Sequence, residues 1–202
     1  MEHYFIAKEH KEEDFFEFKA FVEGYEFALK SCDSIFSKDI VDYGTNLLIK
    51  TFVKNQETNL KGKTMLDVGC GYGIIGLALS RVFKEASIDM CDINSVAVEL
   101  SRYNVLKNHA KNIRDIKESN AYENIKGKYD FIITNPPIKA GKENLLNILL
   151  GAYEHLNEYG ELWLVIKKKH GEDSVKKALS NVFSEVEVMK RDAGYYILKA
   201  VK

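Results

Sequence analysis

Two short segments of the chain combine residue types that can do chemistry. In residues 65–76, an apolar stretch runs into Asp67 and is followed by four glycines. In residues 135–137, an asparagine precedes the only two prolines among the 202 residues. Glycine permits positive φ and close approach of the backbone to a ligand, whereas adjacent prolines stiffen the backbone and remove its N–H donors. We therefore expect a ligand-binding turn at the first segment and a rigid corner of hydrogen-bond acceptors at the second.

The glycine-rich segment is compatible with two nucleotide cofactors. Its part from Gly71 to Gly76 satisfies the G-x-G-x-x-G pattern of NAD-binding turns, and Asp92 follows at the spacing of a ribose-binding acid. Asp67, however, is expected to face the place where NAD would put its negative pyrophosphate. A carboxylate there suits the ammonium and sulfonium groups of S-adenosylmethionine (SAM) instead. SAM is therefore the favoured cofactor and NAD the alternative, and a glycine turn without a ligand is a third interpretation.

Polar residues follow the next two strands that the sequence predicts. Residues 86–92 form a strand that ends in Asp92, whose carboxylate is expected to accept hydrogen bonds from ribose hydroxyls. The alternative role for Asp92 is to cap the following helix, although Asn94 is itself a good cap. Asn120 and Ala121 follow a short strand at 114–117 and are predicted to meet an adenine edge.

The Asn-Pro-Pro corner suits methyl transfer to a planar nitrogen. The side chain of Asn135 and the carbonyl of Pro136 form a fixed pair of acceptors for the two hydrogens of an amine. Accepting those hydrogens localises the nitrogen lone pair and aims it at a methyl donor, and the same dipoles stabilise the positive charge that develops. No strong base is needed, because the methylated amine loses its proton easily. The alternative is a loop-forming Asn-Pro-Pro without a catalytic role.

The remaining pattern indicates how these segments are positioned. Apolar strands alternate with helices, which predicts an α/β fold with a doubly wound, mainly parallel, seven-stranded sheet and a C-terminal antiparallel hairpin. Such a closing hairpin is typical of SAM-dependent methyltransferases and not of NAD folds. We expect helices at residues 38–55, from residue 74, after Asn94, at 141–159 with Gly160 as the helix stop, and at 173–183. We expect the later strands at residues 129–134, 162–166, 186–188 and 195–198. Residues 1–30 are predicted to be a small β appendage and 31–202 the main domain.

Composition narrows the class of protein. A length of 202 residues with 46% hydrophobic residues suits a single globular domain. A net charge of −1 gives no global positive field for nucleic acid, although a local patch would suffice. Three cysteines, at 32, 70 and 91, have no metal-binding spacing, so we predict a reduced, cytoplasmic setting and no metal. No apolar run approaches the length of a membrane span, and no signal peptide is expected.

Several motifs together resemble a known enzyme family. Asp67-Val-Gly-Cys-Gly-Tyr-Gly73, Asp92 and Asn135-Pro-Pro-Ile-Lys-Ala-Gly-Lys142 are similar to class I SAM-dependent methyltransferases of the amino-methylating type. More narrowly, they resemble the small-domain group that includes the ribosomal small-subunit RNA guanine-N2 methyltransferases. Asp33-Ser-Ile-Phe-Ser37 and Asp42-x-Gly44 resemble the segment before that group's first strand, and the likeness covers about residues 25–202.

The resemblance implies roles for individual residues. The residues implied at SAM are Phe36, Asp67, Gly69, Cys70, Gly71, Gly73, Asp92, Ile93, Asn120, Ala121 and Asn135. The residues implied at the acceptor nitrogen are Asn135, Pro136 and Pro137, and those implied at the substrate are Ile138, Lys139 and Lys142. Cys70 fits the loop as a small packing residue rather than as a reactive thiol. The chain departs from the pattern at Ile138, where many relatives have an aromatic residue that stacks on the target base, and at Asn120, which is often aspartate.

The resulting prediction is a SAM-dependent N-methyltransferase acting on an exocyclic amine of guanine in ribosomal RNA, with the rRNA or the small ribosomal subunit as partner. The first alternative keeps the enzyme and changes the acceptor to a protein glutamine or a small amine, which Ile138 and the neutral net charge favour. A SAM-binding module without catalysis and an NAD oxidoreductase are the further alternatives.

Overall fold

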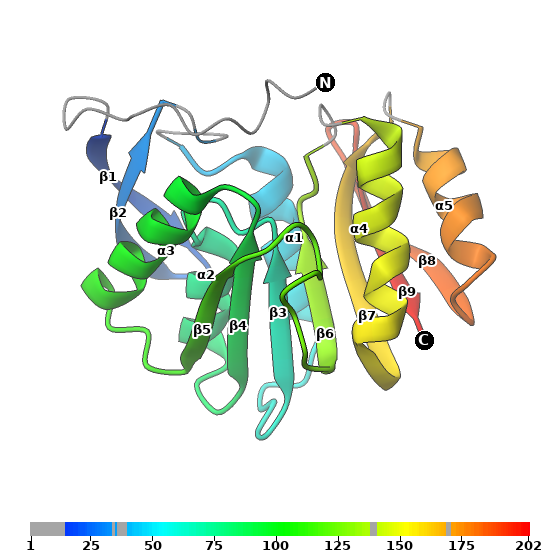
Figure 1. Ribbon diagram of the computed structural model, residues 1–202, viewed down its shortest axis with the longest axis horizontal. Coiled ribbons are helices and arrows are strands. Elements are labelled where there is room, and N and C mark those ends of the chain that lie inside the picture. Colours follow the sequence, from blue (N-terminus) through cyan, green and yellow to red (C-terminus); the bar gives the residue numbers. More distant parts are fainter. Residues whose placement is uncertain (1–14, 34, 36–39, 138–140, 169–170) are drawn as a thin grey trace.

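A seven-stranded sheet forms the centre of the computed structural model, which describes residues 15–33, 35, 40–137, 141–168 and 171–202 (Figure 1). Its strands are β3 (Thr64–Val68), β4 (Ser87–Asp92), β5 (Ile113–Glu118), β6 (Tyr129–Thr134), β7 (Leu156–Lys167), β8 (Glu185–Asp192) and β9 (Tyr195–Val201). The strand order is β5-β4-β3-β6-β7-β9-β8. All pairs from β5 to β7 are parallel, whereas β9 runs antiparallel to both β7 and β8. The predicted fold class, including the closing hairpin, is confirmed.

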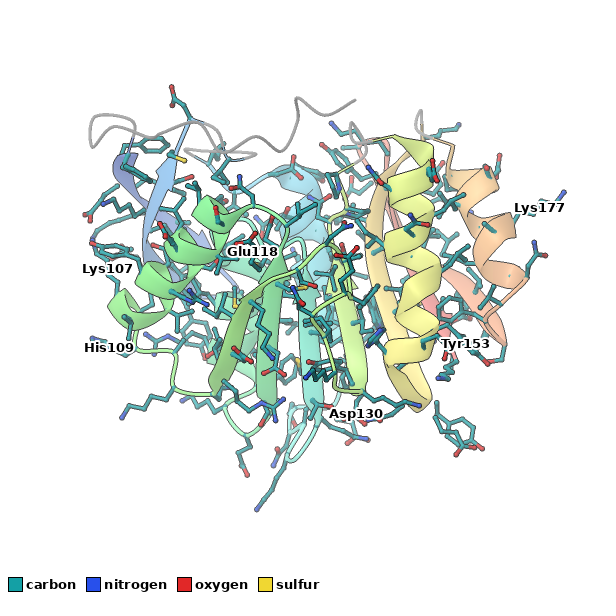
Figure 2. All side chains as sticks on the ribbon, viewed as in Figure 1. Lys107, His109, Glu118, Asp130, Tyr153 and Lys177 are labelled. Carbon is teal, nitrogen blue, oxygen red and sulfur yellow. The ribbon has the colours of Figure 1, made fainter. Side chains whose placement is uncertain are left out.

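Helices cover both faces of this sheet, and their side chains fill the space between the layers (Figures 1 and 2). They are α1 (Tyr43–Asn55), α2 (Ile74–Val82), α3 (Ser95–Lys107), α4 (Lys142–His155) and α5 (Glu172–Ser180). One hydrophobic core packs α1, α2 and α3 against the sheet, and a second core packs α4 and α5 against the other face. Because successive strand residues point to opposite faces, Met65 of β3 lies in the first core and Leu66 in the second. No helix in the described ranges has both the length and the apolar character that spanning a membrane requires.

An antiparallel hairpin precedes the sheet, as predicted. It consists of β1 (Phe15–Val22) and β2 (Tyr25–Cys32), joined by Glu23 and Gly24 with φ of +47° and +83°. Consecutive positive φ angles match the right-handed twist of paired strands, and glycine adopts them without strain. Residues 1–14 lie outside the described residues. The division into an appendage at 1–30 and a domain at 31–202 stays a prediction.

The side-chain amides of Asn104 in α3 and of Asn108, which caps the end of α3, bind the outer edge of β2 as a neighbouring strand would. Asn104 accepts a hydrogen bond from the Lys30 N–H at 2.7 Å and donates to the Lys30 carbonyl at 2.9 Å. Asn108, one turn later, makes the same pair of bonds with Ala28, at 3.0 Å and 2.8 Å. Asn104 also donates to the Tyr72 carbonyl at 2.8 Å, which connects the hairpin to the glycine-rich loop.

Three predicted helix boundaries were wrong, and the simplest case is the helix predicted at 173–183, which ends at Ser180. The helix predicted from residue 38 begins at Tyr43, because Asp42 adopts φ −55° and ψ 139° and caps it by accepting a hydrogen bond from the Thr45 N–H. The helix predicted to run to 159 ends at His155, where Leu156 turns to extended angles and starts β7. Gly160 is therefore a strand residue and not a helix stop. A Cβ at Gly160 would lie 2.9 Å from the Asn157 carbonyl oxygen, so close backbone packing explains the glycine.

Candidate functional site

A cavity of about 650 Å³ opens at the edge of the sheet where the parallel strands end. This edge is where the strand order reverses, since β3 has β4 on one side and β6 on the other. Parallel α/β folds bind ligands at such a switch point, and the volume is in the usual range for small-molecule sites. The predicted site residues that line this cavity are Gly69, Cys70, Gly71, Asp92, Ile93, Asn120, Ala121, Asn135, Pro136 and Pro137.

The remaining predicted residues are not on the described wall. Asp67 and Gly73 are not among the residues that line the cavity. Phe36, Ile138 and Lys139 lie outside the described residues. Lys142 is the first residue of α4, but its side chain is outside the description. The predicted substrate contacts of Ile138, Lys139 and Lys142 and the predicted role of Phe36 therefore stay predictions.

Asp67 lies buried at the end of β3, beneath the glycine-rich loop, with only 1% of its surface exposed. Its Oδ2 accepts a hydrogen bond from the Gly76 N–H at 3.1 Å, whereas Oδ1 has no hydrogen-bond partner among the described residues. Burial raises the pKa of Asp67 to about 7, and the nearby Asp92 carboxylate acts in the same direction. A carboxylate in this position carries an unbalanced charge that a nearby cation would stabilise.

The glycine-rich loop is fastened to the end of β4 by its own N–H groups. Gly69 and Cys70 donate to the Cys91 carbonyl at 2.8 Å and 3.0 Å, and Gly71 donates to Asp92 Oδ2 at 2.8 Å. Gly69 and Gly71 have φ of +74° and +58°, the left-handed region that favours glycine. These three N–H groups therefore donate hydrogen bonds within the protein. At Gly69 and Gly71 the cavity wall consists of backbone atoms alone.

The loop's next residues explain the glycine at 73 and the cysteine at 70. Gly73 precedes α2 with φ +93°, and a Cβ there would lie 3.0 Å from Met90 Cε. Close packing on β4 thus accounts for this glycine. Burial raises the pKa of the Cys70 thiol, whose Sγ lies 3.4 Å from Ser101 Oγ. Cys70 therefore stays protonated and acts as a packing residue at the wall.

Asp92 places a carboxylate on the cavity wall with both oxygens engaged. Besides Oδ2 with Gly71, its Oδ1 accepts a hydrogen bond from the Asn94 N–H at 2.9 Å. Asn94 itself caps α3 by accepting from the Val96 N–H at 3.0 Å, so the capping role falls to Asn94 rather than to Asp92. Burial raises the pKa of Asp92. Each oxygen keeps lone-pair capacity for a further donor in the cavity.

The Asn120–Ala121 turn forms the wall beyond β5. Asn120 is exposed and donates to Glu123 Oε1 at 2.9 Å. Ala121 has φ +48°, and its carbonyl accepts a hydrogen bond from Ser119 Oγ at 2.9 Å. Ser119 Oγ also accepts from the Asn124 N–H at 3.0 Å, so one hydroxyl fixes the turn from both sides.

Asn135 is held at the end of β6 by the first turn of α1. Its Nδ2 donates to Thr45 Oγ1 at 2.8 Å and to Asp42 Oδ2 at 3.4 Å. Both amide hydrogens are thereby directed at α1, and no residue in the described part of the chain donates to Oδ1. Because Pro136 and Pro137 have no N–H, the corner exposes acceptors only. The structure therefore gives Asn135 the orientation in which its oxygen accepts.

Several residues of the wall were not predicted. Asp42 and Thr45 line the cavity, and so do Lys167 and Tyr195 from the ends of β7 and β9. The Lys167 Nζ lies 4.8 Å from the centre of the Tyr195 ring. The Asp42-x-Gly44 pattern was a usable signal for the first pair. Lys167 and Tyr195 are brought together only by the pairing of β7 with β9, which no local pattern reveals.

Comparisons with known proteins identify the family. A family described as methyltransferase small domain matches residues 26–199. The uncharacterized protein YbxB of Bacillus subtilis is 44% identical over 179 residues, which are 88% of this chain and 87% of YbxB. Ribosomal RNA small subunit methyltransferase C of Shigella boydii is 36% identical over 141 residues, which are 68% of this chain but only 39% of that protein.

A solved structure shares the fold. The T. thermophilus 16S rRNA N2 G1207 methyltransferase (RsmC), in complex with AdoMet and guanosine, matches with a TM-score of 0.82 at 23% identity. The match covers 93% of this chain and 50% of that one, so the chain spans about half of this relative. The chain belongs to the methyltransferase small domain family, whose cofactor is S-adenosylmethionine.

Proposed function

We propose that the protein is a SAM-dependent N-methyltransferase that methylates an exocyclic amine of guanine in ribosomal RNA. The observation that carries this proposal is the orientation of Asn135, whose amide nitrogen binds Thr45 and Asp42 while its oxygen remains available to accept. The names of the relatives and the guanosine bound in the RsmC structure support guanine in small-subunit rRNA as the acceptor.

The cavity fits the cofactor. A Cβ built on Gly69 meets no protein atom within 4 Å, so this glycine keeps open a space that any other residue would fill. The buried Oδ1 of Asp67 lacks a partner among the described residues, and although Asp67 does not line the cavity, its charge beneath the loop favours a cationic ligand on the other side. We assign the methionine part of SAM to Gly69–Gly71 and Asp67, and the ribose to Asp92. Asn120 and Ala121 are assigned to the adenine. When bound, SAM supplies an electrophilic methyl group.

The Asn-Pro-Pro corner would then orient the acceptor. The Asn135 Oδ1 and the Pro136 carbonyl accept the two hydrogens of the guanine amine, which keeps the nitrogen lone pair out of the ring system and pointed at the methyl donor. As positive charge develops on nitrogen, the same two dipoles stabilise it without reorganisation. Pro137 contributes rigidity. Residues 135–137 supply no basic side chain. None is required, because the positively charged methylated amine formed by the transfer is acidic enough to release its extra proton to water.

The proposal extends to partner and location. The acceptor nitrogen must reach the bottom of a cavity at a strand edge, so the target guanine has to be unpaired or flipped out of its stack. Ribosomal RNA or the small ribosomal subunit is therefore the proposed partner, and the cytoplasm the proposed location.

The test is transfer of labelled methyl from SAM to small ribosomal subunits lacking the modification, followed by mapping of the modified base. We expect labelled N2-methylguanine with wild-type protein. Asn135→Ala should lower the rate roughly a hundredfold, the usual scale for removing one preorganised dipole. SAM affinity measured by calorimetry should stay within about twofold. Asn181→Ala, at the end of α5 and outside the cavity, is the matched control and should match wild type.

Each alternative has its own result. Labelled methyl in protein glutamine, with none in RNA, would show that the acceptor is a protein and not RNA. SAM binding without transfer to any fraction of the extract would indicate a binding module. Unchanged RNA methylation by Asn135→Ala would remove the mechanism proposed for the corner.

A further inference from the structure

The two ends of the cavity differ in charge. Of the described residues that line it, only Lys167 carries a positive charge, and it lies at the end near Asn135. At the opposite end the lining includes Glu123, and an adjoining hollow is lined by Glu118 and Glu123 without any lysine or arginine among its described residues. A phosphate-bearing strand would be repelled at the end near Asn120, whereas at the end near Asn135 the charge of Lys167 offsets that of Asp42 and removes the repulsion.

Exposed cations and aromatic rings meet beside Lys167. The ring of Tyr195 lies 5.5 Å from that of Tyr43, whose exposed fraction is 48%. The Lys168 N–H donates to the Gly194 carbonyl at 2.9 Å, which holds this exposed lysine next to the β8–β9 turn. We call Tyr43, Lys167, Lys168, Arg191 and Tyr195 the aromatic–basic rim.

The rim keeps a positive charge despite its acidic neighbours. The hydrogen bond with Tyr195 and, after it, the Asp42 carboxylate raise the pKa of Lys167, which therefore stays protonated. Arg191 pairs with Tyr196 and lies with its guanidinium carbon 5.4 Å from the centre of that ring, on the face of the hairpin opposite to Tyr195. A strand that crosses the end of the sheet would therefore meet Tyr43 and Lys167 on one face and Arg191 on the other. Asp42 and Asp192 oppose these three cations. Asp42 is already committed to Thr45 and Asn135, so two exposed cations, Lys168 and Arg191, remain available to an external anion.

We propose that the aromatic–basic rim binds the unpaired RNA strand next to the target nucleotide, with Tyr43 stacking on a neighbouring base and Lys168 and Arg191 contacting phosphates. This inference rests on the proposed function and adds the surface and the direction of approach. Proteins hold single strands by combining a cationic groove with aromatic platforms that accept any base. The residue after Asn-Pro-Pro is Ile138, which offers no aromatic face, so stacking has to come from elsewhere in the chain.

The rim's position also fits its role. Lys167 ends β7 and Tyr195 starts β9, and the two are paired in the antiparallel ladder. Tyr195 in turn packs against Gly44, where a Cβ would lie 2.6 Å from Tyr195 Cε1. The rim is therefore joined rigidly to the turn that contains Asp42 and Thr45. A strand bound there would deliver its next nucleotide to Asn135 along a fixed path.

Fluorescence anisotropy with a short unpaired, guanine-containing RNA tests the charges. The double variant Lys168→Glu/Arg191→Glu should bind at least tenfold more weakly than wild type. Its slope of log affinity against log salt should be shallower by about one to two, because each phosphate that is no longer neutralised lowers the slope by about one. Lys111→Glu is the matched control, because Lys111 is exposed and precedes β5 at the opposite edge of the sheet. It should leave both the affinity and the slope close to wild type.

A second pair of variants tests stacking. Tyr43→Leu should weaken RNA binding roughly tenfold, whereas Tyr43→Phe keeps the ring and should bind as wild type does. Tyr159→Leu removes an exposed ring near the start of β7, at the end of that strand opposite to Lys167, and should have no effect. SAM affinity and the unfolding midpoint of each variant report whether the fold is retained.

The failures are distinguishable. If wild type methylates RNA and the rim variants bind RNA with unchanged affinity and salt slope, the rim proposal is overturned and the proposed function stands. If the rim variants and Lys111→Glu weaken binding equally, the attraction is nonspecific and the rim proposal is again overturned. If the wild type methylates protein and not RNA, the proposed function itself fails.

Discussion

The amide nitrogen of Asn135 lies 2.8 Å from Thr45 Oγ1, a contact between a strand end and a helix start that are 90 residues apart in sequence. The same nitrogen lies 3.4 Å from the Asp42 carboxylate. A flipped amide would put its oxygen against that carboxylate, which electrostatic repulsion disfavours. The first turn of α1 thus decides which atom of Asn135 faces the cavity.

Replacing Thr45 should uncouple rate from cofactor affinity. Thr45→Val keeps the side-chain shape but removes the acceptor of the Asn135 amide, so we expect kcat to fall roughly tenfold, the scale of one hydrogen bond. SAM affinity should change by less than about twofold, and Thr45→Ser should recover most of the rate. Thr51→Val removes another hydroxyl of α1, one that donates to the Leu47 carbonyl at 2.7 Å, and serves as control. Equal loss of rate in both valine variants would contradict this role of Thr45.

The raised pKa of Asp67 predicts a pH-dependent contribution to stability. The folded protein holds a proton on Asp67 up to pH of about 7, whereas the ordinary pKa is 3.8. The folded state therefore binds more protons between these values, so this carboxyl makes the free energy of unfolding fall as pH rises from about 4 to about 7, with no further change above. Asp67→Asn stays neutral, and its stability relative to wild type should rise over that interval. Urea unfolding at pH 5, 6, 7 and 8 measures the difference; a constant difference would disprove a raised pKa.

Gly76 and Met90 should be energetically coupled. A Cβ at Gly76 would lie 2.6 Å from Met90 Sδ, and Met90 is buried. Gly76→Ala alone should cost about 1–3 kcal/mol through overpacking, and Met90→Ala alone about 2–5 kcal/mol through a cavity. The double variant should be more stable than the sum of the two losses, because each change relieves the other. If the losses in unfolding free energy of the two single variants simply add up in the double variant, α2 shifts away from Met90 instead.

Asn104 should stabilise the N-terminal hairpin more than an ordinary polar residue does. Asn104→Ala removes the two bonds to Lys30 and the bond to the Tyr72 carbonyl, all made by a side chain with no exposed surface. We expect a loss of about 3 kcal/mol and faster hydrogen exchange at the Lys30 amide. Asn55→Ala, which removes a single hydrogen bond made by an exposed residue at the end of α1, should cost less than about 1 kcal/mol. Unchanged exchange at Lys30 would mean that β1 alone holds β2.

Local sequence patterns were sufficient for one strand that leads into the site and for the glycine-rich turn. The predicted strand at 129–134 matches β6, and a mostly apolar run of that length, rich in β-branched and aromatic residues, favours a buried strand over a short buried helix. Glycines at 69 and 71 indicated a turn with positive φ, which the structure has at both. Both features depend on residues that are close together in the sequence, so the sequence alone is enough to predict them.

Other features of the fold and of the site depended on contacts between distant segments. Leu156 is buried and continues the apolar spacing of α4, so its change to extended angles could not be read from the pattern. Asp67 preceded the loop as predicted, yet its buried position beneath the loop depends on the Gly76 N–H and on how α2 packs. The approach of Thr45 to Asn135, likewise, follows from α1 crossing the sheet beside β7 rather than from either local sequence.

The reversed direction of β9 has an evolutionary consequence. Tyr195, the first residue of β9, reaches the cavity, so the two-residue turn between β8 and β9 borders the cavity without belonging to any parallel strand. Insertions or replacements in this turn can therefore reshape what the enzyme accepts without shifting the register of the strands that position the cofactor loops. Changes confined to this turn would therefore alter the mouth of the cavity and leave the glycine-rich loop as it is.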